Sequence, residues 1–167
     1  TAVFLEEWSW AENFIYTYQN KLLSSQKIDA LNYARGFYDF HRGHFEKSLI
    51  YLNQIESRGL IFSLRYKPLF IKCFYEISLN DNSYEDDFIF AQIEAFEKFL
   101  RRSKYLSTAK SKPCLNFCLA TKKLVGLKNQ RQIRDLEIQE LEKFIESEEI
   151  ISKTWIQKKL AVIKRLF

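Results

Sequence analysis

Hydrophobic positions recur every three to four residues along most of this chain, which is the pattern of amphipathic α-helices. Polar and glycine-containing breaks separate the segments. The helices predicted in this way cover residues 10–24, 28–42, 45–57, 60–79, 84–103, 107–127 and 129–149, and a last helix begins near residue 152. The pattern therefore predicts an all-α fold of seven or eight helices without a β-sheet.

One seven-residue pattern occurs three times in altered form. Each copy has an aromatic residue, three mostly polar residues, then Phe or Leu, Ile, and Tyr or Phe. The aromatic residues Trp10, Phe45 and Tyr84 lie 35 and 39 residues apart, a period typical of stacked helical hairpins. We interpret residues 1–103 as repeat hairpins, the first one truncated, and residues 104–167 as helices that continue and cap the array.

Local signals predict where several helices begin and end. Ser9 with Glu12 three residues later forms a capping-box pattern, and Ser83 and Ser152 stand where N-caps are expected. Gly43 is suited to the left-handed conformation that ends a helix. Proline lacks an N–H group and restricts the helix around it, so we expect Pro68 and Pro113 near helix starts or at kinks. These signals predict a tight helix–turn–helix over residues 28–57.

That hairpin resembles a tetratricopeptide (TPR) repeat. The resemblance rests on Gly36, on Gly43 seven residues later, and on Phe45, Leu49 and Tyr51. Polar residues depart from the family pattern at three positions, namely Asn32, Asp39 and Ser48. Residues 96–102, 115–117 and 155 further resemble the C-terminal segment of bacterial TPR-like proteins that have no assigned activity. The resemblance implies a right-handed superhelix of antiparallel helical hairpins, an α-solenoid.

In such a solenoid the first helix of each hairpin lines a concave surface. By resemblance, the residues that would project there and bind a protein or peptide are Tyr33, Phe37, Phe40, His41, Arg65, Lys72, Tyr75 and Glu76. Burial of the aromatic members in the core is the alternative. Ala34 stands where a carboxylate-clamp TPR domain would need Asn, so the resemblance does not support a chaperone-tail ligand.

Charge is segregated along the chain, whose formal net charge is +5. Residues 98–134 carry eleven basic residues and no acidic residue, residues 135–149 carry a net charge of −6, and residues 150–167 carry +5. One interpretation is a phosphate-binding surface formed by Lys98, Arg101, Arg102, Lys104, Lys110, Lys112, Lys122 and Lys123. The other, which we favour, places the basic helix beside the acidic one, with the last basic helix on the acidic helix's other side.

The sequence shows no constellation typical of catalysis or of cofactor binding. Four scattered glycines do not form a phosphate loop, and we interpret His41 and His44 as turn residues. Cys73, Cys114 and Cys118 are odd in number and are expected to be reduced, buried and free of metal, which favours a cytoplasmic protein. No apolar run approaches the roughly 18 residues that a membrane span requires.

The leading hypothesis is a non-enzymatic, TPR-like scaffold segment of a larger protein that binds a protein or peptide and needs no cofactor. The alternatives are nucleic-acid binding through residues 98–134, and a purely structural cap on a protein whose activity lies upstream.

Overall fold

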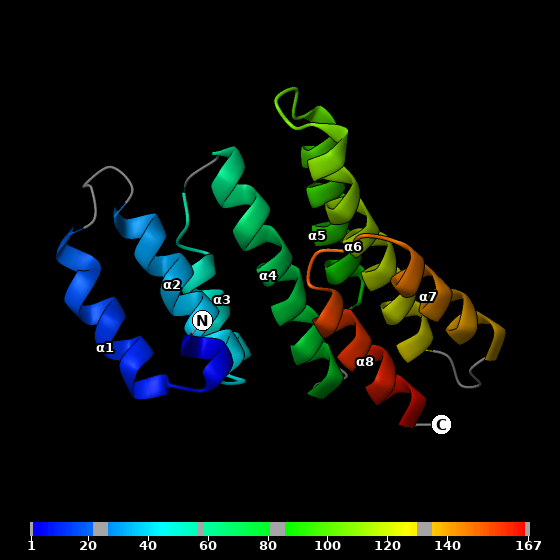
Figure 1. Cartoon of the computed structure of the whole chain (residues 1–167), viewed down its shortest axis with the longest axis horizontal. Helices are drawn as coiled ribbons and strands as arrows, with labels where there is room; N and C mark the ends of the chain where they lie inside the picture. Colours follow the sequence, from blue (N-terminus) through cyan, green and yellow to red (C-terminus); the bar gives the residue numbers. More distant parts are fainter. Residues whose placement is uncertain (1, 22–26, 57–58, 81–85, 130–134, 166–167) are drawn as a thin grey trace. The chain divides into compact units, whose positions relative to one another are not determined.

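The computed structural model describes residues 2–21, 27–56, 59–80, 86–129 and 135–165, and within them every regular element is a helix. In chain order these are the 3-10 helix η1 (Ala2–Leu5), α1 (Trp8–Tyr18), the 3-10 helix η2 (Gln19–Lys21), α2 (Lys27–His41), α3 (Phe45–Leu52), α4 (Leu60–Asn80), α5 (Asp86–Arg102), α6 (Thr108–Lys128), α7 (Asp135–Ser147) and α8 (Lys153–Arg165) (Figure 1). The predicted all-α fold class is confirmed. The right-handed superhelix stays a prediction.

The chain divides into two compact units, Thr1–Glu85 and Asp86–Phe167. The division therefore comes earlier than the boundary expected after residue 103, and α5 belongs with the C-terminal helices. Ser83 and Tyr84, which the sequence suggests as a helix cap and as the third copy of the repeat, lie outside the described residues.

In the first unit, two glycines shape the α2–α3 hairpin. Gly43 has a φ of +78° and forms the turn between the helices. At Gly36 the helices are so close that an added Cβ would lie 2.8 Å from Cδ2 of the buried Leu52. The turn predicted at Gly43 is therefore confirmed, and the absence of a side chain at Gly36 lets α2 and α3 approach closely.

The three polar departures from the TPR pattern are buried, and each has a polar partner. Ser48 donates its hydroxyl to the Gly36 carbonyl (2.7 Å), Asn32 donates to the Gln54 carbonyl (3.4 Å), and Asp39 lies 3.4 Å from Nδ1 of His44. Cys73 of α4 in turn donates to the Ser48 hydroxyl at 3.3 Å. These bonds join α2, α3 and α4 through buried polar groups.

Two predicted helix limits in the first unit are wrong. The helix α1 begins at Trp8 and has Ser9 inside its first turn, so Ser9 forms no capping box with Glu12. The chain already turns at Glu6, whose φ is +59°. The helix α3 ends at Leu52 rather than near residue 57, because α2 binds the backbone that follows: Asp29 accepts from the Glu56 N–H at 3.0 Å.

In the second unit, α6 contacts α5, α7 and α8, so it has buried residues on nearly all of its sides (Figure 1). Phe117 and Leu124 of α6 are fully buried, as are Phe96 of α5, Leu141 of α7 and Ile156 of α8. The charge pattern suggests that α8 lies on the far side of α7. The helix α8 instead contacts α6 as well as α7.

Polar contacts fix the α7–α8 connection to α6. The amide of Asn116 donates to a Glu148 carboxylate oxygen (3.1 Å) and to the Glu149 carbonyl (3.0 Å). The Ile151 N–H donates to the carbonyl of Pro113 at 3.3 Å. Pro113 lies inside α6 and Pro68 inside α4, so neither proline begins a helix.

Candidate functional site

The first unit exposes a row of aromatic rings along α1. Trp10, Phe14 and Tyr18 are spaced four residues apart, and their rings stack with centroid distances of 5.1 Å and 4.5 Å. Their exposed fractions are 57%, 45% and 44%, whereas the only residue of α1 that is buried is Ala11. We call these three residues the α1 ladder. The aromatic stripe of α1 therefore faces solvent and not the core.

A second aromatic row runs along α2, and we call it the α2 ladder. The ring of Phe37 lies 6.1 Å from that of Tyr33 and 4.5 Å from that of His41. All three side chains are half-buried. The spacing of four residues again places them on one face of the helix.

The two ladders border one apolar groove of about 430 Å³. Its lining residues are Val3, Trp10, Ala11, Phe14, Ile15, Tyr33, Ala34 and Phe37. No lining side chain is charged. Ala11 and Ala34 carry the smallest side chains among them, so α1 and α2 leave open space between the larger rings. We call this hollow the aromatic groove.

The eight residues predicted to project from a concave face fall into two groups. Tyr33, Phe37 and His41 remain partly accessible and Arg65 of α4 is exposed, while Phe40, Lys72, Tyr75 and Glu76 are buried. Burial raises the pKa of the Tyr33 hydroxyl, and the positive charge of nearby Arg65 acts in the opposite direction. Arg65 therefore lies close to the α2 ladder.

The buried group contains an unusual lysine. The Lys72 ammonium lies 4.7 Å from the centroid of the Phe40 ring. Burial lowers the pKa of Lys72 to about 8, although Cys73 and Glu76 favour the charged form. Burial also raises the pKa of the Cys73 thiol to about 12, so this cysteine is a poor nucleophile at neutral pH.

Sequence reasoning found the α2 ladder but missed the α1 ladder. Aromatic residues at a spacing of four are most simply interpreted as a buried stripe. The signal that pointed the other way was Ala11, because a small residue at a helix–helix contact lets the neighbouring large residues remain outside.

In the second unit, the predicted phosphate-binding residues also separate into two groups. Three of them form ion pairs: Lys112 with Glu148 (2.9 Å), Lys122 with Glu97 (2.9 Å) and Lys123 with Glu140 (3.9 Å). The bond between Lys112 and Glu148 raises the pKa of the lysine and lowers that of the carboxyl group. The other five, Lys98, Arg101, Arg102, Lys104 and Lys110, are exposed.

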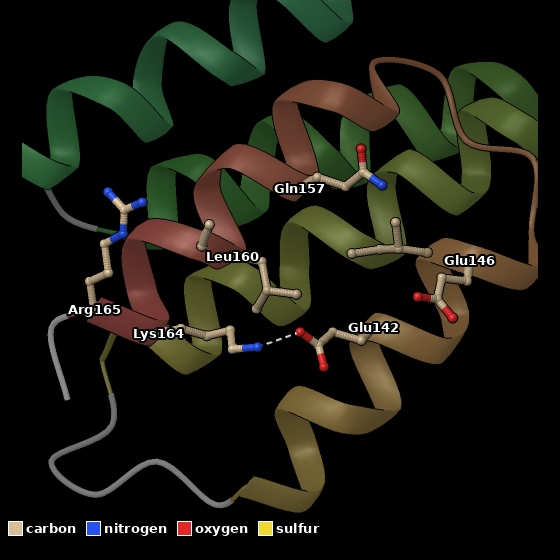
Figure 2. Close-up of a pocket in the computed structure, with 8 residues that line it drawn as sticks. Glu142, Glu146, Gln157, Leu160, Lys164 and Arg165 are labelled. Carbon is tan, nitrogen blue, oxygen red and sulfur yellow. Dashed lines mark hydrogen bonds and ion pairs between the residues drawn. The ribbon is translucent and has the colours of Figure 1, made fainter.

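A hollow of about 380 Å³ lies between α7 and α8. Figure 2 shows Glu142 and Lys164 pointing toward each other across it, with Leu160 between the two helices. Lys164 Nζ lies 2.6 Å from a Glu142 carboxylate oxygen, and both side chains are more than a third exposed. Such a surface ion pair stabilises the fold little. One acidic and one basic side chain that line this hollow are therefore already paired with each other.

Other side chains that could take part in chemistry are engaged in structural contacts. His44 has an orienting partner that the sequence did not suggest, because Asp39 lies 3.4 Å away, but the same carboxylate oxygen is 3.5 Å from Lys47. All three cysteines are buried, and the structure pairs none of them in a disulfide. Within the described part of the chain, no three His, Cys, Asp or Glu side chains are grouped to hold a metal ion.

No helix among the described residues is both long enough and apolar enough to cross a lipid bilayer. Comparisons of the chain with protein-family models, with curated proteins and with solved structures found no significant match.

Proposed function

We propose that this chain is a non-catalytic binding module that holds an amphipathic helix of a partner protein in the aromatic groove. The observation that carries the proposal is the pair of aromatic ladders on α1 and α2, which border a single uncharged groove of about 430 Å³. Partly exposed aromatic rings around an apolar hollow are typical of surfaces that bury anchor residues of a partner.

The helical walls and the apolar lining of the groove favour a helix as the occupant. Its walls are two helices, and a third amphipathic helix places apolar anchors three and four residues apart along one face. The Phe14, Tyr33 and Phe37 rings would contact those anchors.

Charge near one end of the groove adds a preference. Lys21, which follows the α1 ladder, lies with its ammonium 4.6 Å from the centroid of the Tyr18 ring. Arg65 of α4 lies near Tyr33, which is in the second turn of α2. Both cations stand toward the end where the chain passes from α1 to α2. A bound helix would therefore place acidic residues at that end, beyond its apolar anchors.

The TPR-like resemblance supports the same proposal, since it assigns ligand contacts to the first helix of a hairpin. The helix α2 is that first helix, and its Tyr33 and Phe37 line the groove. The purely structural alternative assigns no partner to either ladder.

Selection of helical 16-residue peptides from a random display library tests the proposal. We expect selected peptides to share large apolar residues three or four positions apart with an acidic residue toward one end. Binding should shift the fluorescence of Trp10 to shorter wavelength, and this shift should be absent in Trp10→Phe. Phe14→Ser and Phe37→Ser should each weaken binding about tenfold or more, the loss expected for one buried ring.

Tyr16→Ser is the matched control. Like Phe14, Tyr16 is an exposed aromatic residue of α1, with an exposed fraction of 73%, but Tyr16 lines a different hollow. The affinity of this variant for the selected peptides should be unchanged. The proposal is wrong if no peptide is selected, or if selected peptides bind Phe14→Ser and Phe37→Ser as tightly as the wild type.

A further inference from the structure

Five cations gather where α5 ends and α6 begins, and we call them the basic tip: Lys98, Arg101, Arg102, Lys104 and Lys110. All five are exposed. Among the described residues, no acidic side chain forms an ion pair with any of them, in contrast to Lys112, Lys122 and Lys123. Internal pairing therefore accounts for one part of the basic segment and leaves the other part open to solvent.

Helix geometry brings these cations together. Lys98, Arg101 and Arg102 are spaced three and four residues apart, so they share a face of α5. Lys104 lies in the turn and Lys110 in the first turn of α6. In Figure 1 this turn forms one end of the α5–α6 pair.

The acidic α7–α8 connection reaches α6 one turn beyond Lys110. Lys112 forms an ion pair with Glu148, and the Pro113 carbonyl accepts a hydrogen bond from the Ile151 N–H. These contacts place the α7–α8 connection beside the second turn of α6. Glu97, the acidic residue nearest in sequence on α5, is bound by Lys122. Glu97 and Glu148 are thus each paired with a lysine outside the basic tip, whose five cations keep an excess of positive charge.

An aromatic ring stands among these cations. Tyr105 is 95% exposed, the most exposed large hydrophobic side chain in the described residues. Its turn is held by two hydrogen bonds, from the Ser103 hydroxyl to the Phe99 carbonyl (2.8 Å) and from the Leu106 N–H to the Ser103 carbonyl (3.1 Å). The ring therefore projects from a bonded turn and has both faces accessible.

From this arrangement we infer that the basic tip and Tyr105 bind single-stranded nucleic acid. The cations contact successive phosphates, and a base stacks on the Tyr105 ring. A single-stranded ligand fits because its bases are free to stack, whereas those of a duplex are paired. An anionic membrane is less well matched, because one tyrosine without exposed aliphatic neighbours buries little apolar area. This site is separate from the aromatic groove and lies in the other unit.

Titration of the whole chain into a labelled 20-nucleotide oligouridine, followed by fluorescence anisotropy at 50 mM and 200 mM KCl, tests the inference. Five phosphate contacts predict a slope of about −3.5 in log K against log salt, hence a loss of affinity of roughly a hundredfold over this range. Arg101→Gln with Arg102→Gln should weaken binding and make the slope shallower by about 1.4.

Tyr105→Ala should lower the affinity by roughly 5- to 150-fold and leave the salt slope unchanged, because it removes stacking but no charge. Tyr105→Phe should restore the affinity. Lys158→Gln with Arg165→Gln is the matched control, because it also removes two exposed positive charges, but from α8. This control variant should not show the loss of affinity or the shallower salt slope expected for Arg101→Gln with Arg102→Gln.

Three results would overturn the inference. The first is no binding of oligouridine at 50 mM KCl. The second is an equal loss in the α8 control variant, which indicates a general charge effect. The third is competition by poly-glutamate or by phosphatidylserine vesicles as effective as that by unlabelled oligouridine, which indicates a polyanion surface rather than a nucleic-acid site.

Discussion

Replacing Gly36 with alanine tests whether the α2–α3 contact determines the stability of the first unit. The new Cβ would lie 2.8 Å and 2.9 Å from Cδ2 and Cγ of Leu52, and 3.3 Å from the Ser48 carbonyl oxygen. Leu52 is only 1% exposed and has little space into which to move. The two helices would therefore have to separate.

The expected magnitude follows from two opposing effects. Alanine in place of glycine inside a helix stabilises by about 1 kcal/mol. Overpacking of a filled contact costs about 1–3 kcal/mol, and separation also weakens the hydrogen bond from Ser48 to the Gly36 carbonyl. We expect a net loss of about 1–2 kcal/mol in the free energy of unfolding.

Gly126→Ala is the matched control, because Gly126 also lies in a helix but has no atom within 4 Å of an added Cβ. It should stabilise the protein by up to about 1 kcal/mol. Urea unfolding followed by circular dichroism and tryptophan fluorescence measures both variants. A double-mutant cycle of Gly36→Ala with Leu52→Ala should show a favourable coupling of about 1 kcal/mol or more. A Gly36→Ala protein as stable as the wild type, or a coupling of zero, would refute the close-contact argument.

Three further predictions concern buried polar groups. Relative to Lys72→Met, the wild type should gain roughly 3 kcal/mol in unfolding free energy between pH 8 and pH 10.5, because over that range only the unfolded chain keeps the proton of Lys72. Urea titrations across this pH range measure the gain, and a difference between the two proteins that does not change with pH contradicts it. Asn116→Leu removes two hydrogen bonds to the α7–α8 connection and should cost roughly 1–3 kcal/mol, measured by unfolding that is followed through Trp155 fluorescence, and an unchanged midpoint counts against it. An aromatic disulfide reagent should label thiols only after unfolding, so rapid labelling of the native protein would disprove the burial of Cys73, Cys114 and Cys118.

The sequence pattern predicted most helices because each has a periodic apolar stripe and a recognisable stop. Gly43 and the polar residues that follow α4 are signals of this kind, and they act within one turn of the chain. The limit of α3 was not predictable in this way. It depends on Asp29 of α2 binding the Glu56 backbone, a contact between residues 27 positions apart.

The surfaces proposed to bind ligands were predicted less completely, for a related reason. The sequence shows that the basic segment lies between acidic ones, but it does not show which lysines reach an acidic partner. Lys122 pairs with Glu97 of α5 rather than with the acidic helix that follows in sequence. Similarly, the apolar character of Trp10 and Phe14 is local, whereas their exposure results from the tertiary packing of Ala11.

The two proposed sites lie in different units, and this makes them separable by experiment. Phe14→Ser changes only the first unit and should leave oligouridine binding unaltered, while Arg101→Gln with Arg102→Gln should leave peptide binding unaltered. If each variant affects only its own ligand, the chain carries two independent binding surfaces. If the basic-tip variant also weakens the selected peptides, the acidic end of the peptide is being bound by those arginines. Charge attraction at the tip, rather than the aromatic groove, would then explain the peptide affinity.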